Sequence, residues 1–224
     1  MKLLKLKKVL APIKFFFHYI LFKFTNDMKY YERAFSFLSI LFKDQKTFWN
    51  QATSIYNTRY SNDIPDKLFL KTVIKLSKKE QKILEFGCST GFNLCYLYSK
   101  KYSFLTGIDI SDRSINVAKK TKNQIKYYSL DLSKVDLNYN YDIIFARATF
   151  QHIPPNQINN IFYNLIKSLN KTGKLIFKEA FNKNEPFSRI ENHRVYSTFN
   201  HNYFEILKRY NVKQIDDCLF ILTI

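Results

Sequence analysis

The stretch KILEFGCSTG, residues 82–91, joins a short apolar run to a turn that contains two of the four glycines in the chain. Gly87 and Gly91 allow such a turn to fold tightly and leave bare backbone beside which a ligand can lie. Residues 92–100 have a helical pattern, and the start of a helix offers free backbone N–H groups. The stretch is neither the dinucleotide fingerprint G-x-G-x-x-G nor a P-loop with its Lys-Ser or Lys-Thr. It therefore predicts a ligand site of another kind at the end of a first strand.

Short apolar runs alternate with helical stretches over residues 80–224. The predicted strands are KILEF, FLTGIDI, IKYYSL, YDIIFAR, KLIFKEA, VKQID and LFILTI, and the predicted helices are residues 92–100, 111–122, 155–169 and 200–209. Strands that alternate with helices form a parallel sheet covered on both faces. Only Asp217 and Cys218 separate the last two strands, which must therefore form an antiparallel hairpin. The predicted fold class is α/β, a doubly wound, mostly parallel seven-stranded sheet with an antiparallel last strand.

An acid, Asp109, stands at the carboxyl end of the second predicted strand. In nucleoside-binding sheets, a carboxylate at this place accepts hydrogen bonds from the hydroxyls of a ribose. Asp109 could instead cap the helix that follows, but Ser111 and Asp112 already suit that role. We therefore expect Asp109 to bind a ribose.

These features resemble the class I S-adenosylmethionine-dependent methyltransferases. Glu85-x-Gly87-x-x-x-Gly91 matches the family's first motif, with Ser89 in place of the commoner middle glycine, and Gly107-Ile108-Asp109 matches the second. Residues 127–132 match the third motif, residues 141–146 with 152–154 resemble the fourth strand and its trailing His, and residues 169–175 match the approach to the fifth strand. All four glycines fall on these motifs. The resemblance implies a Rossmann-like methyltransferase fold over about residues 80–224 and S-adenosylmethionine as the cofactor. The cofactor-binding residues it implies are Glu85, Gly87, Cys88, Gly91, Asp109, Ile110, Asp131 (on the adenine amino group), Leu132 and Ala146.

The family pattern also places His152 at the mouth of the pocket. A sulfonium is an activated methyl donor, so positioning supplies much of the rate, but an oxygen or nitrogen nucleophile must still lose a proton. We expect His152 to be that base, its alternative role being to start a helix beside two prolines. Glu179 is a second catalytic candidate, which could instead pair with Lys178 or Arg189 on the surface. No set of acids suggests a metal.

Substrate groups are expected from segments outside the sheet. One set precedes the first strand and could form a lid over the methionine part of the cofactor, with Arg59 or Tyr60 near its carboxylate. A second set follows the fifth strand and could bind a sugar or phosphate. The alternatives are ordinary loop aromatics and ion pairs with the chain's own carboxylates. The candidates are Trp49, Tyr56, Arg59 and Tyr60 in the first set and Arg189, His193, Arg194 and Tyr196 in the second.

Residues 1–48 form a basic N-terminal extension, and residues 49–79 a lid or helical segment whose helix starts near Pro65 with Asp63 as its cap. Leu3, Leu6, Leu10, Ile13, Phe17, Ile20 and Phe24 recur every three or four residues, the period of one helical face. A helix of this kind either lies on an anionic membrane surface or packs on its own domain or a partner. The apolar run resembles a secretory signal, but Pro12, Lys14 and His18 interrupt it and no small-residue cleavage site follows.

The 36 basic and 18 acidic residues give a formal charge of +18. Of the basic residues 29 are Lys and 7 are Arg, so we expect no nucleic-acid partner, because phosphate readout favours Arg. Three cysteines without a CxxC spacing suggest a reducing cytoplasm, with peripheral contact at the inner membrane surface as an option.

The expected function is methyl transfer to a hydroxyl, or an amine, of a small-molecule, glycan or lipid-linked acceptor. Residues 146–149 replace the Asp/Asn-Pro-Pro-aromatic element that nucleic-acid amino-methyltransferases carry after the fourth strand. The alternatives are an RNA methyltransferase of another type, suggested by the charge, and a non-catalytic, membrane-attached module that binds the cofactor.

Overall fold

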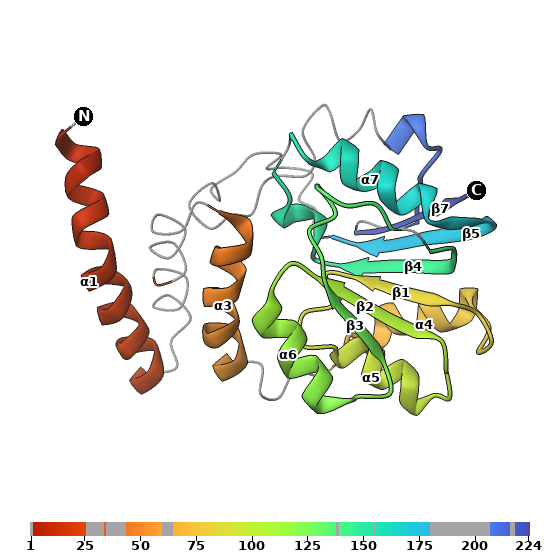
Figure 1. The fold of residues 1–224 in the computed structure, drawn as a ribbon, viewed down its shortest axis with the longest axis horizontal. Coiled ribbons are helices and arrows are strands. Elements are labelled where there is room, and N and C mark those ends of the chain that lie inside the picture. Colours follow the sequence, from red (N-terminus) through yellow and green to blue (C-terminus); the bar gives the residue numbers. More distant parts are fainter. Residues whose placement is uncertain are drawn as a thin grey trace.

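The computed structural model describes residues 2–25, 34, 44–59, 65–137, 139–154, 156–179, 207–215 and 218–224. Two helices, α1 (Lys2–Thr25) and α3 (Gln45–Arg59), precede the sheet and lie to one side of it (Figure 1). No helix among the described residues is long and apolar enough to cross a membrane.

The centre of the protein is one seven-stranded sheet with the order β3-β2-β1-β4-β5-β7-β6. The strands are β1 (Ile83–Phe86), β2 (Leu105–Asp109), β3 (Lys126–Ser129), β4 (Tyr141–Arg147), β5 (Leu169–Lys178), β6 (Lys213–Gln214) and β7 (Leu219–Thr223). Strands β1 to β5 pair in parallel, and β7 is antiparallel to both β5 and β6. The predicted fold class is therefore confirmed, including the terminal hairpin.

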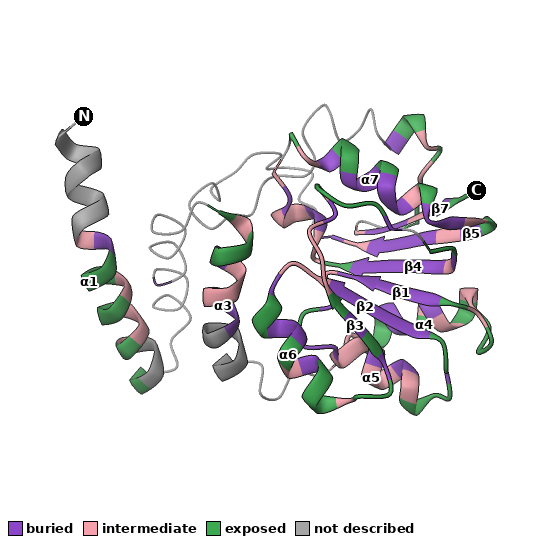
Figure 2. Cartoon of the chain, viewed as in Figure 1, coloured by how far each residue is buried: buried purple, intermediate pink, exposed green. Residues whose placement is uncertain are grey.

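Both faces of the sheet are buried, as the continuous apolar runs predict (Figure 2). Because side chains alternate along a strand, Ile143 and Phe145 of β4 face a core completed by α4 (Lys67–Leu76), α5 (Phe92–Ser99) and α6 (Asp112–Thr121). Ile144 and Ala146 face the opposite core, under α7 (Ile158–Lys167). The helices thus cover both faces and leave the carboxyl ends of the strands for a site.

The starts of the helices position the loops around that site. Asp66 caps α4 by accepting a hydrogen bond from the Phe69 N–H at 3.0 Å, so the cap lies three residues beyond the predicted Asp63, which is outside the described residues. Pro65 consequently precedes the cap instead of lying in the first turn. Ser111 caps α6 as predicted, its hydroxyl accepting from the Ser114 N–H.

Three segments differ from the predicted ranges. Strand β5 begins at Leu169, because Leu169 pairs with Tyr141 before a register shift, and β6 is only two residues long. Helix α7 begins at Ile158 after a short 3-10 helix, η1 (Phe150–His152). Of the helix predicted over 200–209, residues 207–209 are described, and they are helical.

Helix α3 crosses the boundary predicted at residue 48, and that division of the chain stays a prediction. The helix contacts the start of α6 through polar side chains: the Thr53 hydroxyl lies 2.7 Å from that of Ser114 and 3.1 Å from that of Ser111. The Asn50 side chain accepts from the Ser111 hydroxyl at 2.9 Å. Lys46 and Asp112 add an ion pair at 2.9 Å. These bonds hold α3 beside the carboxyl ends of β1 and β2.

Candidate active site

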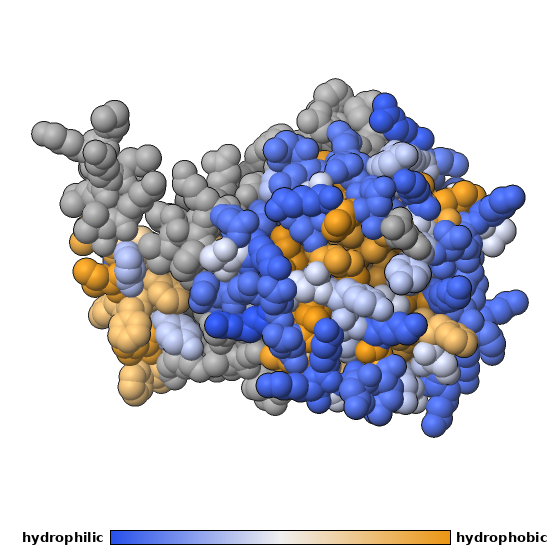
Figure 3. Space-filling model, viewed as in Figure 1, coloured by the Kyte–Doolittle hydropathy of each residue, from blue (hydrophilic) through white to orange (hydrophobic). Residues whose placement is uncertain are grey.

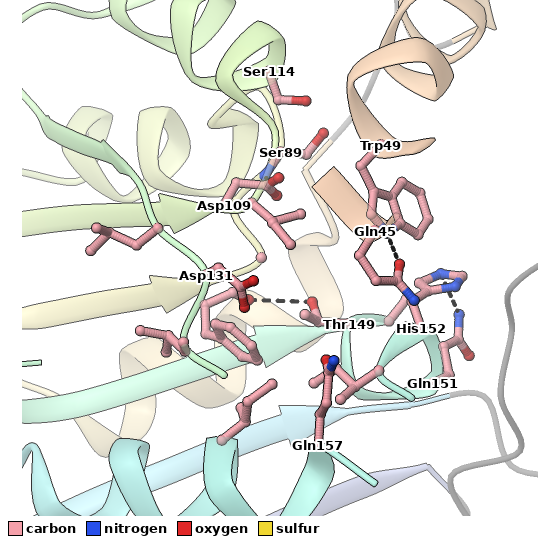
Figure 4. A pocket seen from close by; sticks show the side chains of 18 of the residues that line it. Gln45, Trp49, Ser89, Asp109, Ser114, Asp131, Thr149, Gln151, His152 and Gln157 are labelled. Atoms are coloured by element: carbon pink, nitrogen blue, oxygen red, sulfur yellow. Dashed lines mark hydrogen bonds between the residues drawn. The ribbon is translucent and has the colours of Figure 1, made fainter. Parts of the chain in front are cut away.

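A cavity of about 440 Å³ opens at the carboxyl ends of β1, β2 and β4 and in the loop after β3 (Figure 4). Helix α3 forms one wall, and η1 with the start of α7 forms another. The lining residues are Gln45, Trp49, Thr53, Phe86, Gly87, Ser89, Asp109, Ile110, Ser114, Leu130, Asp131, Leu132, Arg147, Ala148, Thr149, Gln151, His152, Ile153, Pro154, Gln157 and Ile161.

The glycine turn after β1 forms the floor of this cavity. Gly87 has φ +71°, and a Cβ built on it would lie 2.4 Å from the Thr149 side chain, so only glycine leaves room there. Ser89, in place of the usual middle glycine, also has a left-handed backbone, with φ +48°. That conformation costs a non-glycine residue about 1–2 kcal/mol. A hydrogen bond from the Ser89 N–H to the Asp109 carboxylate, at 2.9 Å, helps to hold it.

Asp109 lies at the tip of β2, with its carboxylate at the cavity. Its two oxygens accept hydrogen bonds from the backbone N–H groups of Ser89 and Ser111, both at 2.9 Å. Burial raises the pKa of this carboxyl, and the backbone N–H donors oppose the shift. Each carboxylate oxygen has a second lone pair, so Asp109 can hold the turn and still accept bonds from ligand hydroxyls.

Asp131 stands just beyond β3 and also lines the cavity. Its carboxylate accepts from the Ser133 N–H and hydroxyl, at 3.1 and 2.6 Å, and pairs with Lys134 at 2.9 Å. Burial acts to raise its pKa, but the Ser133 bonds and Lys134 outweigh that effect and lower it. Asp131 therefore stays ionised as an acceptor, beside the apolar side chains of Leu130 and Leu132.

His152 and Trp49 pack against each other on one side of the cavity, as Figure 4 shows. Their ring centroids are 4.8 Å apart in an edge-to-face arrangement. The Trp49 indole N–H donates to the Gln45 side chain at 3.1 Å, and the Gln151 amide nitrogen lies 3.3 Å from Nε2 of His152. The imidazole is thus positioned by one residue from α3 and one from its own short helix.

Glu179 is the second predicted catalytic candidate. It is not among the described residues that line the cavity. It is buried, and its carboxylate accepts backbone N–H bonds from Thr149 and Phe150 at 2.9 Å and from Gln151 at 3.1 Å. Burial raises the pKa of the Glu179 carboxyl to about 7, although the three N–H donors act to lower it. Its contacts are those of an anchor for the loop that carries His152.

We expect Glu179→Gln to lower the free energy of unfolding by about 1–3 kcal/mol, because the new amide N–H₂ faces the Gln151 N–H and leaves buried donors without an acceptor. Urea unfolding measures this effect, with Glu80→Gln on the exposed surface as the matched control. A variant of normal stability that has lost methyl transfer would instead make Glu179 a direct participant in the reaction.

Glu85 also lies outside the lining of the cavity within the described structure. Its Oε1 accepts from the Asn93 amide at 2.7 Å, and its buried Oε2 has no hydrogen-bond partner among the described residues. Burial raises its pKa to about 8. Its hydrogen bond with Asn93 connects β1 to α5 beside the glycine turn.

The predicted site residues divide into three groups. Lining the cavity are Trp49, Gly87, Asp109, Ile110, Asp131, Leu132 and His152. Outside its lining are Glu85, Cys88, Gly91, Ala146 and Glu179, of which Cys88 and Ala146 are buried in the two cores and Gly91 starts α5. Not described are the side chains of Tyr56 and Arg59 in α3 and the whole of Tyr60, Arg189, His193, Arg194 and Tyr196.

Several polar residues that line the cavity were not predicted from the sequence: Gln45, Thr53, Ser114, Arg147, Thr149, Gln151 and Gln157. Gln45, Trp49 and Thr53 recur every four residues and so share one face of α3. That spacing was the available signal, although only the fold shows that this face meets the cavity.

Residues 83–173 match the family model described as a methyltransferase domain. This segment of the chain is thus similar to a methyltransferase domain. The match is consistent with the predicted family. The match covers β1 to the first part of β5 and includes both the glycine turn and the acids at the tips of β2 and β3.

Two solved structures share the fold of this methyltransferase domain. The TehB-like SAM-dependent methyltransferase from Corynebacterium glutamicum has a TM-score of 0.61 at 15% identity, over 77% of this chain and 97% of that one. The DhpI structure in complex with SAH has a TM-score of 0.60 at 15% identity, over 80% and 93% of the two chains.

Curated relatives match over shorter ranges. Malonyl-[acyl-carrier protein] O-methyltransferase of Bacillus anthracis is 35% identical over 101 residues, which are 43% of this chain and 36% of that protein. Carboxy-S-adenosyl-L-methionine synthase of Campylobacter concisus is 27% identical over 122 residues, 52% of each chain. The matched part is thus about a third to a half of the length of these relatives.

Proposed function

We propose that this protein transfers a methyl group from S-adenosylmethionine to an oxygen, or less readily an amine, of an acceptor that carries a negative charge. The observation that carries this proposal is the cavity itself: Asp109 and Asp131 line one part of it, and His152 and Arg147 line another. The activity and cofactor named by the similar proteins support the proposal.

The lining of the cavity fits this cofactor. Asp109 and Asp131 are acceptors suited to the ribose hydroxyls and the adenine amino group, with Ile110, Leu130 and Leu132 as apolar neighbours for the base. The bare backbone at Gly87 leaves space that a Cβ would fill. When bound, S-adenosylmethionine supplies a methyl group on a sulfonium centre, and its positive charge suits a cavity lined by two carboxylates.

His152 acts as the base in this proposal. The Gln151 amide nitrogen lies 3.3 Å from Nε2 of His152, and a neutral imidazole has one ring nitrogen whose lone pair can take a proton. Transfer would form a bond from the acceptor oxygen to the methyl carbon and break the bond from that carbon to sulfur, which would leave a neutral thioether, while the proton of the acceptor O–H would move to His152. Trp49 keeps the ring oriented and limits access of water from the α3 side.

Arg147 indicates the charge of the acceptor. It stands at the end of β4, half-exposed, and its Nε donates to Asp66 at 2.9 Å. Lys178 donates to the same Asp66 oxygen at 3.0 Å, so the single carboxylate of Asp66 faces two cations. Arg147 also acts on the buried carboxyls of Glu85 and Glu179, because burial raises their pKa values and its charge acts to lower them. As a half-exposed cation in the cavity lining, it can still bind a carboxylate or phosphate on the acceptor.

The test is a transfer assay with radiolabelled donor on metabolite and lipid extracts separated by anion exchange. We expect label in the fractions retained by the column, and Arg147→Gln to raise KM for the labelled acceptor about tenfold or more. Arg113→Gln is the control, since it removes the same charge from an exposed position on α6 outside the cavity lining. Label only in unretained fractions contradicts an anionic acceptor, and cofactor binding without any transfer favours a binding module.

A further inference from the structure

The outer face of α1 exposes a row of large apolar side chains. The exposed fractions are 68% for Ile13, 63% for Phe16, 58% for Phe17, 36% for Ile20 and 85% for Phe24. Their spacing of three and four residues places all five on one side of the helix. In Figure 3 this part of α1 forms a hydrophobic patch beside a largely hydrophilic surface. Isolated exposed apolar residues need no explanation, but a continuous row of this size marks an interaction surface.

The opposite side of α1 is the inner side. Ala11 is fully buried, and Phe15, His18 and Tyr19 are half-buried. At about 100° per residue these four positions lie across the helix from Ile13 and Phe24. The row of five is therefore exposed while the other face of the same helix is already covered.

The charge of α1 indicates its partner. The helix contains six lysines and no acidic residue, within a chain of net charge +18. The positions of Lys5 and Lys23 flank the apolar row on one side, and Lys14, which is exposed, flanks it on the other. Lysines at the borders of an apolar face suit a helix that lies in the headgroup layer of a bilayer.

We propose that α1 binds the surface of an anionic lipid bilayer, with Ile13, Phe16, Phe17, Ile20 and Phe24 inserted below the headgroups and the flanking lysines on lipid phosphates. A second copy of this chain fits less well, because an α1–α1 contact would bring six lysines from each copy together without any acid on either helix. Anionic lipid instead neutralises them.

This surface is separate from the cavity. Helix α1 lies on the far side of α3 from the sheet (Figure 1), and none of its described residues lines the cavity. Membrane binding and methyl transfer are therefore independent proposals, and either can fail without the other.

The test is sedimentation of the full chain with vesicles of phosphatidylcholine alone or of phosphatidylcholine mixed equally with phosphatidylglycerol. We expect binding to the mixed vesicles, weakened by salt, and a loss of about tenfold or more in the partition coefficient for the double variant Phe17→Ser/Phe24→Ser. Lys14→Gln should reduce binding to the mixed vesicles about fivefold. Leu68→Ser/Phe104→Ser, which alters two equally exposed apolar residues elsewhere, is the matched control and should bind normally.

Three outcomes would overturn the proposal. They are undiminished binding by the Phe17/Phe24 variant, an equal loss in the Leu68/Phe104 control, and a dimer of the unaltered chain that becomes a monomer in the Phe17/Phe24 variant without any vesicle binding. The last result would assign the apolar row to self-association. Circular dichroism of each variant verifies that the fold is kept.

Discussion

His152→Ala is expected to lower the turnover number by about 10²–10⁴ while the affinity for S-adenosylmethionine stays the same. The reason is that His152 lines the cavity in contact with Trp49, whereas Asp109 and Asp131 are the residues expected to hold the nucleoside. Single-turnover rates give the first quantity and calorimetry gives the second.

The pH profile adds an independent measure for the same variant. A base works in its neutral form, so the rate of the unaltered enzyme should rise with pH through the range in which histidine titrates, about pH 5–8. That rise of the rate with pH should be missing in His152→Ala. Gln151→Ala, which keeps the imidazole but removes its amide neighbour, should retain the rise of the rate with pH and lose only part of the rate. Full turnover in His152→Ala would mean that positioning alone drives the transfer.

Asp109→Ala is expected to weaken cofactor binding by about 1.5–3 kcal/mol, the range for hydrogen bonds to a charged group, which corresponds to roughly 10- to 150-fold in Kd. Asp109→Asn should have a smaller effect, since it keeps one acceptor oxygen. Calorimetry with S-adenosylmethionine and its demethylated product measures both.

The matched control for this prediction is Asp112→Ala. Asp112 stands three residues away at the start of α6, but it pairs with Lys46 and does not line the cavity. Its loss should leave Kd unchanged. If Asp109→Ala also leaves Kd unchanged and only lowers the melting temperature, Asp109 stabilises the turn at Ser89 and does not bind a ligand.

The part of the site that follows directly from the sheet could be predicted from the sequence. The apolar runs of β1, β2 and β4 are strands buried on both faces, and the end of each fixes the position of the next loop. Gly87 was predictable because few residues tolerate φ +71°, and Asp109 because the strand ends there. Both depend on residues close in the chain.

The rest of the site depends on contacts between distant residues. Glu179 was expected to act on the substrate, yet its three hydrogen-bond donors are the N–H groups of residues 149–151, about thirty positions earlier. The cap of α4 was misplaced because Asp63 and Asp66 are equally good caps by residue type, and residue type does not reveal the pairing of Asp66 with the distant Arg147 and Lys178. Likewise, nothing local in α3 indicates that Thr53 meets Ser114.

The attachment of α3 has a kinetic consequence. Its Thr53 and Asn50 bonds to Ser111 and Ser114 hold the helix over the same turn in which Asp109 binds the Ser111 N–H. A nucleoside that left the cavity past this wall would have to displace those hydroxyl bonds. Dissociation of the product and displacement of α3 would then share one barrier, to which four small polar side chains contribute.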